Sequence, residues 1–366
     1  MNVYNKIVWG CGAMIVLLAG SVMLGLFPAE PEAKNASIDL LVGTYGENIH
    51  RYVFDTETLS FEFVEKAEAN NASYVIRVGD AVYAVSETGD ASGVYSFAES
   101  DSLVLTADRR QTGADPCFIM EYDEKVLTAD YSGGSVSVFP VCDNVIGDCI
   151  QKLKFDGNGP VSDRQESSHI HQLKQIPGKE WILASDLGAD VIRLLGFNEG
   201  QLVHETDIPC PPGSGPRHME FNGDASCLYC IAELSGDVLV YDVNLQGDIP
   251  QFTMIQTIQA DEVNAGGSAD IHMHPEGKYL YTSHRLENDG ISVFSVNADG
   301  TLTKTGYART GRHPRNFIIT PDGKHLLVAC MNDRIIQVFE IGEDGSLTLT
   351  ASSLTFDSDR PSSLTF

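Results

Sequence analysis

The fold is decided by the stretch HPRNFIITPDGKHLLVACMNDRIIQVFEIGEDGSLTLTASS, which runs from His313 to Ser353. It contains three short segments rich in β-branched and aromatic residues, and a fourth segment that is more polar. Such residues favour β-strands, and the turns between the segments contain Gly, Asp or Asn. The stretch therefore predicts a small sheet of four strands joined by tight turns.

The same pattern recurs at intervals of roughly 45 to 50 residues, a spacing typical of propeller blades. The second strand is the clearest marker of each repeat. Its seven copies are LLVGTY (ending at Tyr45), AVYAVSE (Glu87), KVLTAD (Asp130), WILASD (Asp186), CLYCIAE (Glu233), YLYTSHR (Arg285) and LLVACMN (Asn332). Seven repeats of four strands predict an all-β chain folded as a seven-bladed β-propeller.

The two ends of the repeat region complement each other. The first repeat begins at LLVGTY without an innermost strand before it, whereas the chain ends in RPSSLTF, from Arg360 to Phe366. We expect this last strand to complete the first blade and to remove the open edge. The propeller is therefore predicted to occupy residues 38–366 and to be closed by its C-terminal strand.

Residues 1–37 are predicted to be a hydrophobic leader and a linker outside the propeller. An uncharged apolar run from Ile7 to Phe27 follows Lys6 and is long enough to span a bilayer or to act as a signal peptide. The segment from Pro28 to Ser37 is typical of a linker. The leader predicts an exported or membrane-anchored protein (periplasmic if bacterial), with the cytoplasm as the alternative, and membrane contact through this segment alone.

The charge and the cysteines exclude several classes of function. With 24 Lys and Arg against 51 Asp and Glu, the net charge is −27, which argues against a nucleic-acid partner. Cys227 and Cys230 form a C-x-x-C within a strand, where their side chains point to opposite faces. Whether Cys142 and Cys149 pair across their short loop stays open. The sequence predicts neither a metal site nor a cofactor, and it leaves the oligomeric state unknown.

The geometry of a blade gathers polar side chains at one mouth of the central channel. The innermost and second strands form an antiparallel hairpin, so the start of the first lies beside the end of the second. The second strands end in the seven residues given above. The innermost strands begin with His169 and His171, Arg217 and His218, Asp270 and His272, and Arg315. Convergent polar groups in a concave mouth predict a ligand site.

Four of these residues are the best candidates for chemistry: His171, Arg217, Glu233 and Arg285. The two arginines make a positive spot in an acidic protein, and a guanidinium binds a carboxylate or phosphate bidentately. Because both stand at strand ends, we expect that truncating them leaves the core intact.

Other mouth residues are expected to contact the substrate or to stabilise the fold. The expected substrate contacts are His169, His218, Arg315 and Asn332. For His169, His218 and His272, the alternative is an ordinary hydrogen-bonded position in the channel. Asp130 and Asp186 precede turns and are expected to cap them.

The chain also resembles the propeller-type lactonases, a family that includes a bacterial 6-phosphogluconolactonase and a fungal 3-carboxy-cis,cis-muconate lactonising enzyme. The resemblance covers roughly Ile38 to Phe366. The stretches that carry it are LLVGTY (40–45), TADYSGGSVSVFPV (128–141), HIHQL (169–173), SDLGADVI (185–192), GSGPRHMEF (213–221), YCIAEL (229–234), YLYTSHR (279–285) and HPRNFIITPDGKHLLVA (313–329). It implies a seven-bladed propeller without metal or cofactor, and a site made of His171, Arg217, Glu233 and Arg285.

These observations favour hydrolysis of a small anionic sugar lactone similar to 6-phosphogluconolactone. No Gly-x-Ser-x-Gly motif offers a serine nucleophile, so His171 or Glu233 is expected to activate a water. An imidazole pKa near 6.5 would suit that role. Two alternatives stay open. One is a muconate-type cycloisomerase, in which the same residues supply a proton. The other is a non-catalytic propeller that binds a protein or a sugar at its mouth.

Overall fold

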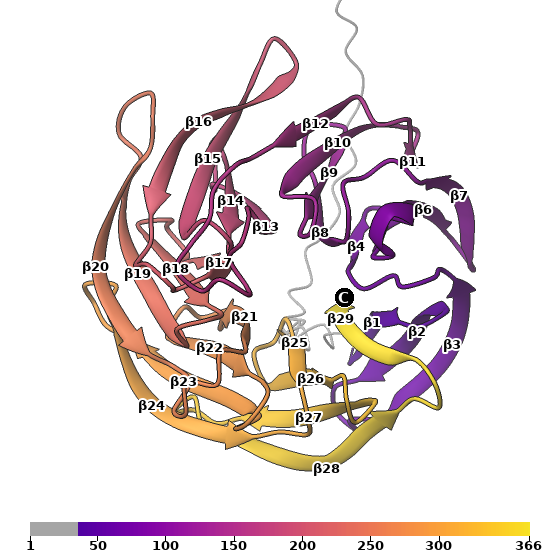
Figure 1. Cartoon of the computed structure of the whole chain (residues 1–366). Coiled ribbons are helices and arrows are strands. Elements are labelled where there is room, and N and C mark those ends of the chain that lie inside the picture. The colour runs from indigo at the N-terminus through magenta and orange to yellow at the C-terminus, as the bar shows by residue number, and fades with distance from the viewer. Residues whose placement is uncertain (1–35) are drawn as a thin grey trace, which may run out of the picture. The chain divides into compact units, whose positions relative to one another are not determined.

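The computed structural model describes residues 36–366, which form seven antiparallel sheets arranged in a ring (Figure 1). The predicted seven-bladed β-propeller is therefore confirmed. The predicted leader and linker fall almost entirely on residues 1–35, outside the described range. No helix of the described residues is both long and apolar enough to cross a bilayer.

Each blade is given from its innermost to its outermost strand. The first three blades are β29 (Arg360–Thr365), β1 (Ser37–Tyr45), β2 (Asn48–Asp55) and β3 (Phe61–Glu68); β4 (Val75–Val78), β5 (Ala81–Ser86), β6 (Gly93–Glu99) and β7 (Leu103–Arg109); and β8 (Pro116–Glu121), β9 (Lys125–Asp130) and β10 (Ser135–Cys142), with β11 (Val145–Ile146) and β12 (Gln151–Lys154) both paired to β10. One short 3₁₀ helix, η1 (Gly89–Ala91), follows β5. The outer edge of blade 3 is thus split between two short strands.

Blades 4 to 7 are regular. They are β13 (Ile170–Gln175), β14 (Ile182–Asp186), β15 (Val191–Asn198) and β16 (Gln201–Pro209); β17 (Pro216–Phe221), β18 (Cys227–Ala232), β19 (Asp237–Asn244) and β20 (Gln251–Gln259); β21 (Ser268–Met273), β22 (Tyr279–His284), β23 (Gly290–Val296) and β24 (Leu302–Arg309); and β25 (Pro314–Ile319), β26 (His325–Cys330), β27 (Ile335–Ile341) and β28 (Leu347–Thr355). The predicted second strand of every repeat is present, although β5, β18 and β22 end one residue, and β26 two residues, before the predicted end.

The core lies between neighbouring blades, because both faces of each inner sheet are covered. Strand β18 shows this most clearly, since all six of its residues are buried. Leu228 and Cys230 pack in the apolar cluster shared with blade 4, whereas Cys227 and Tyr229 pack in the cluster shared with blade 6. The two cysteines therefore point to opposite faces, as the strand period requires. Cys142 and Cys149 carry free thiols in the structure.

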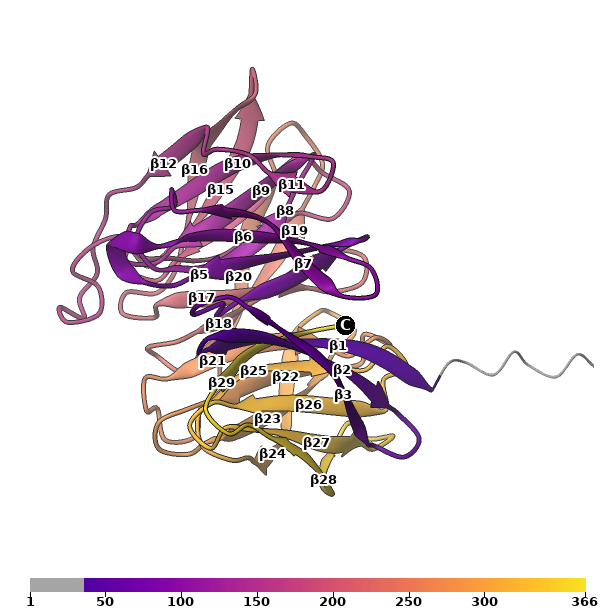
Figure 2. The ribbon, with the colours of Figure 1, turned by 90° about the vertical axis from the view of Figure 1, so that its right-hand side faces the viewer.

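The ring is closed by the two ends of the repeat region. Strand β29 pairs antiparallel with β1, with Leu364 opposite Val42 and Ser363 opposite Gly43 (Figures 1 and 2). A Cβ at Gly43 would overlap the Ser363 hydroxyl and the Ala72 carbonyl. A glycine at this point of LLVGTY therefore lets the closing strand approach the first blade. The predicted closure by the C-terminal strand is confirmed.

Candidate active site

Irregularities at the starts of the innermost strands position the key side chains. The pairing register with the second strand shifts at the same point of β13, β17 and β25, and the skipped residues are His171, Arg217 and Arg315. Bulges of this kind are frequent beside active sites, because they redirect a side chain out of the regular alternation. Gly215, with φ of +63°, precedes the bulge at Arg217 and adopts a conformation that favours glycine.

The carboxylate of Glu233, in the turn after β18, is the centre of the site. Arg217 Nε donates to its Oε2 at 2.8 Å, and Arg285 Nη2, just beyond β22, lies 3.2 Å from the same oxygen. Arg164 Nη2, from the loop between β12 and β13, donates to Oε1 at 2.6 Å. Three of the four candidate catalytic residues are thus in direct contact. We call Arg164, Arg217 and Arg285 the arginine cluster.

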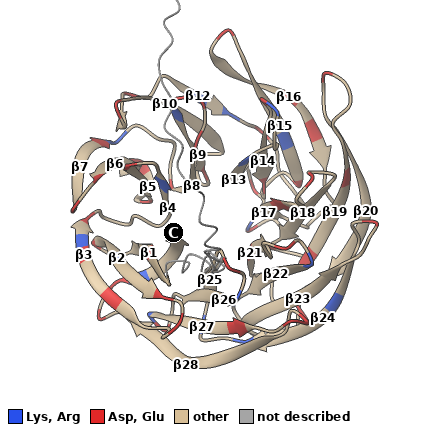
Figure 3. Ribbon diagram, turned by 180° about the vertical axis from the view of Figure 1, so that it is seen from behind, with Lys and Arg blue, Asp and Glu red and all other residues tan. Residues whose placement is uncertain are grey.

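The arginine cluster carries more positive charge than Glu233 can neutralise. Burial alone would raise the pKa of Glu233, but Arg285, Arg217 and Arg164 lower it to about 2, so the group is a carboxylate. Burial, together with the neighbouring Arg217, lowers the pKa of Arg285 to about 9. Acidic residues are scattered over the rest of the ring (Figure 3). The site is therefore suited to an anionic ligand, since buried charges need partners.

His171 lies beside the cluster with its ring edge-on to Tyr131 and to His218, at centroid distances of 5.6 and 5.2 Å. Among the described residues, its buried Nδ1 has no hydrogen-bond partner. Burial, Arg217 and His218 lower the pKa of His171 well below 6.5. The imidazole is therefore neutral over the physiological range. The expected titration near pH 6.5 is wrong, because the sequence reveals neither that this ring is buried nor how many cations surround it.

His218 and Asp270 form a second buried pair directly behind His171. The Nδ1–H of His218 donates to Asp270 Oδ1 at 2.7 Å, and Asp270 Oδ2 also accepts from Asn316 and lies 3.1 Å from His272 Nε2. Burial and Arg217 lower the pKa of His218 to about 4, so its ring is neutral too. This pair fixes the tautomer of His218 and orients its ring toward His171.

Comparison with known proteins assigns the family. Residues 39–366 match the model described as lactonase, 7-bladed beta-propeller. The 6-phosphogluconolactonase of Formosa agariphila is 31% identical, over 80% of this chain and 88% of that protein. The chain belongs to the seven-bladed lactonase family. The 6-phosphogluconolactonase of Bacillus subtilis is 28% identical, over 86% of this chain and 94% of its own length.

Solved structures agree with this lactonase-family assignment. A candidate 6-phosphogluconolactonase from Bacteroides fragilis superimposes with a TM-score of 0.86 at 38% identity, covering 92% of this chain and 99% of that one. The periplasmic gluconolactonase of Pseudomonas aeruginosa gives a TM-score of 0.81 at 27% identity, covering 89% and 98%.

The remaining predicted residues of this lactonase-family propeller fall into two groups. Arg315 lies near the cluster; its Nη2 donates to Tyr45 Oη at 2.7 Å, and that hydroxyl donates to Glu87 Oε2 at 2.6 Å. His169 is buried, stacks on Tyr131 and bonds its carbonyl. Asn332, by contrast, is exposed in the turn after β26, and within residues 36–366 no hydrogen bond joins its side chain to the site.

The two aspartates expected to cap turns are structural. Asp130 accepts hydrogen bonds from Thr128, Ser135 and Ser137, and burial raises its pKa to about 6. Asp186 binds Arg193, whose Nη2 donates at 2.6 Å. Both carboxylates therefore hold their own blades together rather than face the mouth.

The expectation that the arginines can be truncated without harm to the core is wrong for Arg217. This side chain is 2% exposed and is the largest of the fully buried side chains. Besides Glu233, it bonds the carbonyl of Ala269 on the next blade. Its removal would leave a cavity and weaken the pairing of a buried carboxylate, which costs about 3–5 kcal/mol in comparable ion pairs. A strand end at the mouth is thus not an exposed position.

Buried neutral histidines should make the protein less stable in acid. His284, fully buried between the hydroxyls of Ser268 and Thr282, has its pKa lowered to about 3 by burial and by Lys304 and Arg285. Between the two pKa values, His284 is protonated in the unfolded chain, where its pKa is about 6.5, but not in the folded chain. The free energy of unfolding therefore falls as pH falls below about 6.5.

Replacing this histidine should weaken that pH dependence. We expect His284→Gln to reduce the loss of unfolding free energy between pH 6 and pH 4 by up to about 1.4 kcal/mol per pH unit. Urea denaturation at several pH values measures the slope. His204→Gln, on the partly exposed outer strand β16, is the matched control. An unchanged slope in His284→Gln would mean that this ring is protonated in the fold.

Proposed function

We propose that this protein hydrolyses a small anionic sugar lactone, of the kind named in its 6-phosphogluconolactonase and gluconolactonase relatives. The observation that carries the proposal is the arginine cluster around the buried Glu233, which retains positive charge for a bound anion. These relatives are named as lactonases, which favours lactone hydrolysis over the two alternatives, a cycloisomerase and a non-catalytic binding propeller.

The reaction needs only water and this chain's side chains. A water oxygen attacks the lactone carbonyl carbon while neutral His171 takes up the proton of that water. Arg217 and Arg285 stabilise the negative charge that develops on the carbonyl oxygen. The bond between the carbonyl carbon and the ring oxygen then breaks, and His171 returns the proton to that oxygen. The product is the open-chain hydroxy acid.

The electrostatics of the site support this role for His171. Its neutral form is ready to accept a proton, although burial and the surrounding cations lower the pKa of the free imidazole and make it a weak base. Negative charge on the bound substrate and on the developing oxyanion offsets those cations. The basicity of His171 therefore rises as the reaction proceeds, whereas Glu233 mainly holds the arginines in place.

The direct test is a lactone hydrolysis assay on the purified protein. Proton release is followed with 6-phosphogluconolactone, gluconolactone and a muconate lactone, and the uncatalysed rate is subtracted. We expect turnover of at least one sugar lactone and none of the muconate compound. Absence of turnover on every sugar lactone would contradict the proposal.

We further propose that the protein acts outside the cytoplasm. Support comes from the apolar run Ile7–Phe27 and from the similarity to a gluconolactonase named as periplasmic. Fractionation of cells that express the full chain tests this, with a variant lacking residues 1–35 as the control. Recovery of the full chain in the cytoplasmic fraction would contradict it.

A further inference from the structure

Arg164 has no counterpart in the repeat pattern. It lies in the loop between β12 and β13, yet its Nη2 reaches Glu233 Oε1 at 2.6 Å and Tyr131 Oη at 3.4 Å. Within residues 36–366, no hydrogen-bond partner is found for its Nε or Nη1. The guanidinium can therefore bind another group without leaving the mouth.

The three arginines differ sharply in exposure. The side chain of Arg164 is 35% exposed, whereas those of Arg217 and Arg285 are 2% and 6% exposed. The two buried guanidinium groups also bond backbone carbonyls of blade 6 or the segment before it, which fixes them in place. A ligand that enters from solvent meets Arg164 first, and only Arg164 can change partner without opening the core.

The loop that carries Arg164 is held firmly. Next to it, the fully buried Gln165 donates from Nε2 to Asp190 Oδ1 at 2.7 Å and to the Leu187 carbonyl at 2.8 Å. Asp190 also accepts from the backbone N–H of Gly215, two residues before Arg217. The buried carboxylate of Asp190 thus holds both loops. It thereby fixes the positions of Arg164 and Arg217 relative to each other at the mouth.

On the basis of the proposed lactonase function, we propose that Arg164 is the specificity-determining residue that binds a second anionic group of the substrate, a phosphate remote from the lactone carbonyl. Arg217 and Arg285 lie too deep to serve both ends of such a substrate. A guanidinium with free N–H groups at the rim provides the bidentate contact that a phosphate prefers.

Binding at Arg164 would also change Glu233. In the free protein, Arg164 shares this carboxylate with the other two arginines and contributes to its low pKa. A phosphate bound to the free Nε and Nη1 of Arg164 leaves Nη2 on Glu233 Oε1 and brings negative charge close to this carboxylate. The net positive charge of the arginine cluster beside the reacting carbonyl then falls. Recognition of the far end of the substrate is thereby coupled to the reacting end.

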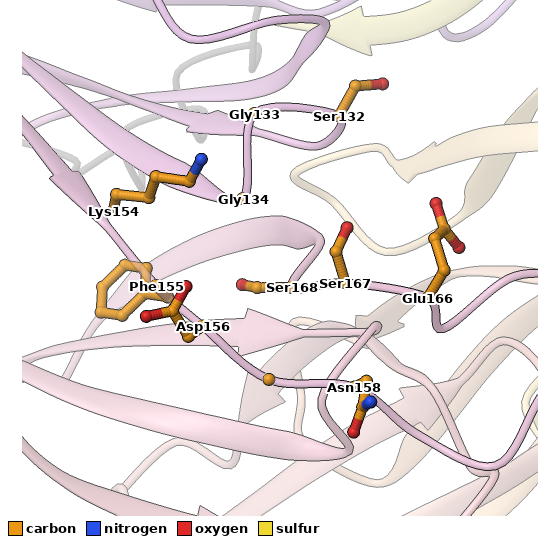
Figure 4. A pocket seen from close by; sticks show the side chains of 11 residues that line it. Ser132, Gly133, Gly134, Lys154, Phe155, Asp156, Asn158, Glu166, Ser167 and Ser168 are labelled. Carbon is orange, nitrogen blue, oxygen red and sulfur yellow. The ribbon is translucent and has the colours of Figure 1, made fainter. Parts of the chain in front are cut away.

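The pocket on the other side of the same loop is a poorer site for the phosphate. This cavity of about 460 Å³ is lined by Lys154, Asp156 and Glu166, by Phe155 and Asn158, and by serines and glycines (Figure 4). Lys154 is the single cation among its lining residues, which also include two carboxylates, Asp156 and Glu166; all three side chains are exposed. Repulsion from Asp156 and Glu166 opposes an anion there, which leaves Arg164 as the better partner.

The experiment compares two acids that differ only by the phosphate. Calorimetry on the purified full chain measures binding of 6-phosphogluconate and of gluconate. We expect the wild type to bind 6-phosphogluconate at least about tenfold more tightly, as one charge-assisted contact allows. Arg164→Gln should remove most of this preference, and Arg164→Lys should retain part of it.

Two further variants separate the local role from general charge and from loop position. Lys278→Gln removes one positive charge from an exposed turn at the opposite end of the channel, and it should keep the full preference. Gln165→Ala keeps the Arg164 side chain but removes the hydrogen bonds that hold its loop. We expect it to reduce the preference for 6-phosphogluconate without abolishing it.

The outcomes distinguish this inference from the proposed function. An equal preference in wild type and Arg164→Gln, or no preference in the wild type, would overturn the role of Arg164 even if lactones are hydrolysed. Failure of the lactone assay would overturn the proposed reaction. The binding data would then still show whether Arg164 selects the phosphate.

Discussion

A chain that ends at Asp359 should fail to form a stable propeller. The deletion removes β29, which supplies the innermost strand of blade 1 and pairs with β1 from Leu41 to Tyr45. It also removes links to both neighbouring blades. Leu364 N donates to Asn316 Oδ1 of β25 at 2.8 Å, and Ser362 Oγ donates to the Ser73 carbonyl at 2.9 Å.

The expected loss is large compared with the whole stability of a domain. Several buried hydrogen bonds of about 1 kcal/mol each disappear, together with the burial of Leu364, worth about 2 kcal/mol. The exposed edge of β1 adds unpaired backbone groups. Against a typical net stability of about 5–15 kcal/mol, we expect loss of the cooperative thermal transition or a fall in Tm of more than about 15 °C.

Calorimetry and circular dichroism measure this outcome. A synthetic peptide covering Asp359–Phe366 should restore part of the transition when added to the truncated chain, because its hydrogen-bonding partners on β1 and β25 remain. Deletion of Phe366 alone is the control; this residue lies beyond the last paired residue and packs partly against the apolar cluster of blades 1 and 7, so its loss should lower Tm far less. A truncated protein with the Tm of the full chain would show that the ring is held without β29.

The fold could be predicted from the sequence because a propeller repeats the same local information seven times. Each blade needs only strand-forming segments and tight turns, as in the repeat from His313 to Ser353, and the turns pin the pairing of neighbouring strands. The closure followed from a missing strand at one end and a spare strand at the other. These predictions rest on local strand and turn signals and on the number of strands at each end, and they do not depend on side-chain contacts.

The candidate site was predictable only in part. His171, Arg217, Glu233 and Arg285 could be grouped because strand direction places them at one mouth. Arg164 could not, because it lies in an irregular loop with no position in the repeat. The signal to look for in such a case is an inserted loop that is longer than its counterparts and contains an isolated arginine.

Burial and protonation were also beyond reach of the sequence. Whether Arg217 is exposed depends on Ala269 and other residues of the next blade, and the pKa of His171 depends on Arg217 and His218. These contacts join residues distant in sequence. The strand pattern predicts that these side chains lie at the same end of the channel. It does not predict how many charged groups surround each of them.

Replacing Arg217 by lysine should abolish most of the activity while keeping the positive charge. Arg217 uses Nε for Glu233 and Nη1 for the Ala269 carbonyl, a fixed fork that aims the guanidinium at the reacting end of the site. A lysine ammonium is a single point and cannot reproduce this geometry. Since loss of one oxyanion donor costs roughly two to three decades in rate, we expect kcat/KM on the confirmed lactone to fall by about 100-fold or more.

The lysine variant must be compared with changes that separate chemistry from stability. Arg217→Ala should lower both kcat/KM and Tm, because it leaves a cavity beside a buried carboxylate, whereas Arg217→Lys should lower kcat/KM with a smaller loss of Tm. Glu233→Gln should reduce kcat/KM as well, because it releases Arg217 and Arg285 from their shared partner while preserving shape. If Arg217→Lys kept kcat/KM within threefold of the wild type, charge alone would suffice at this position. The oxyanion role assigned to its fixed fork would then be wrong.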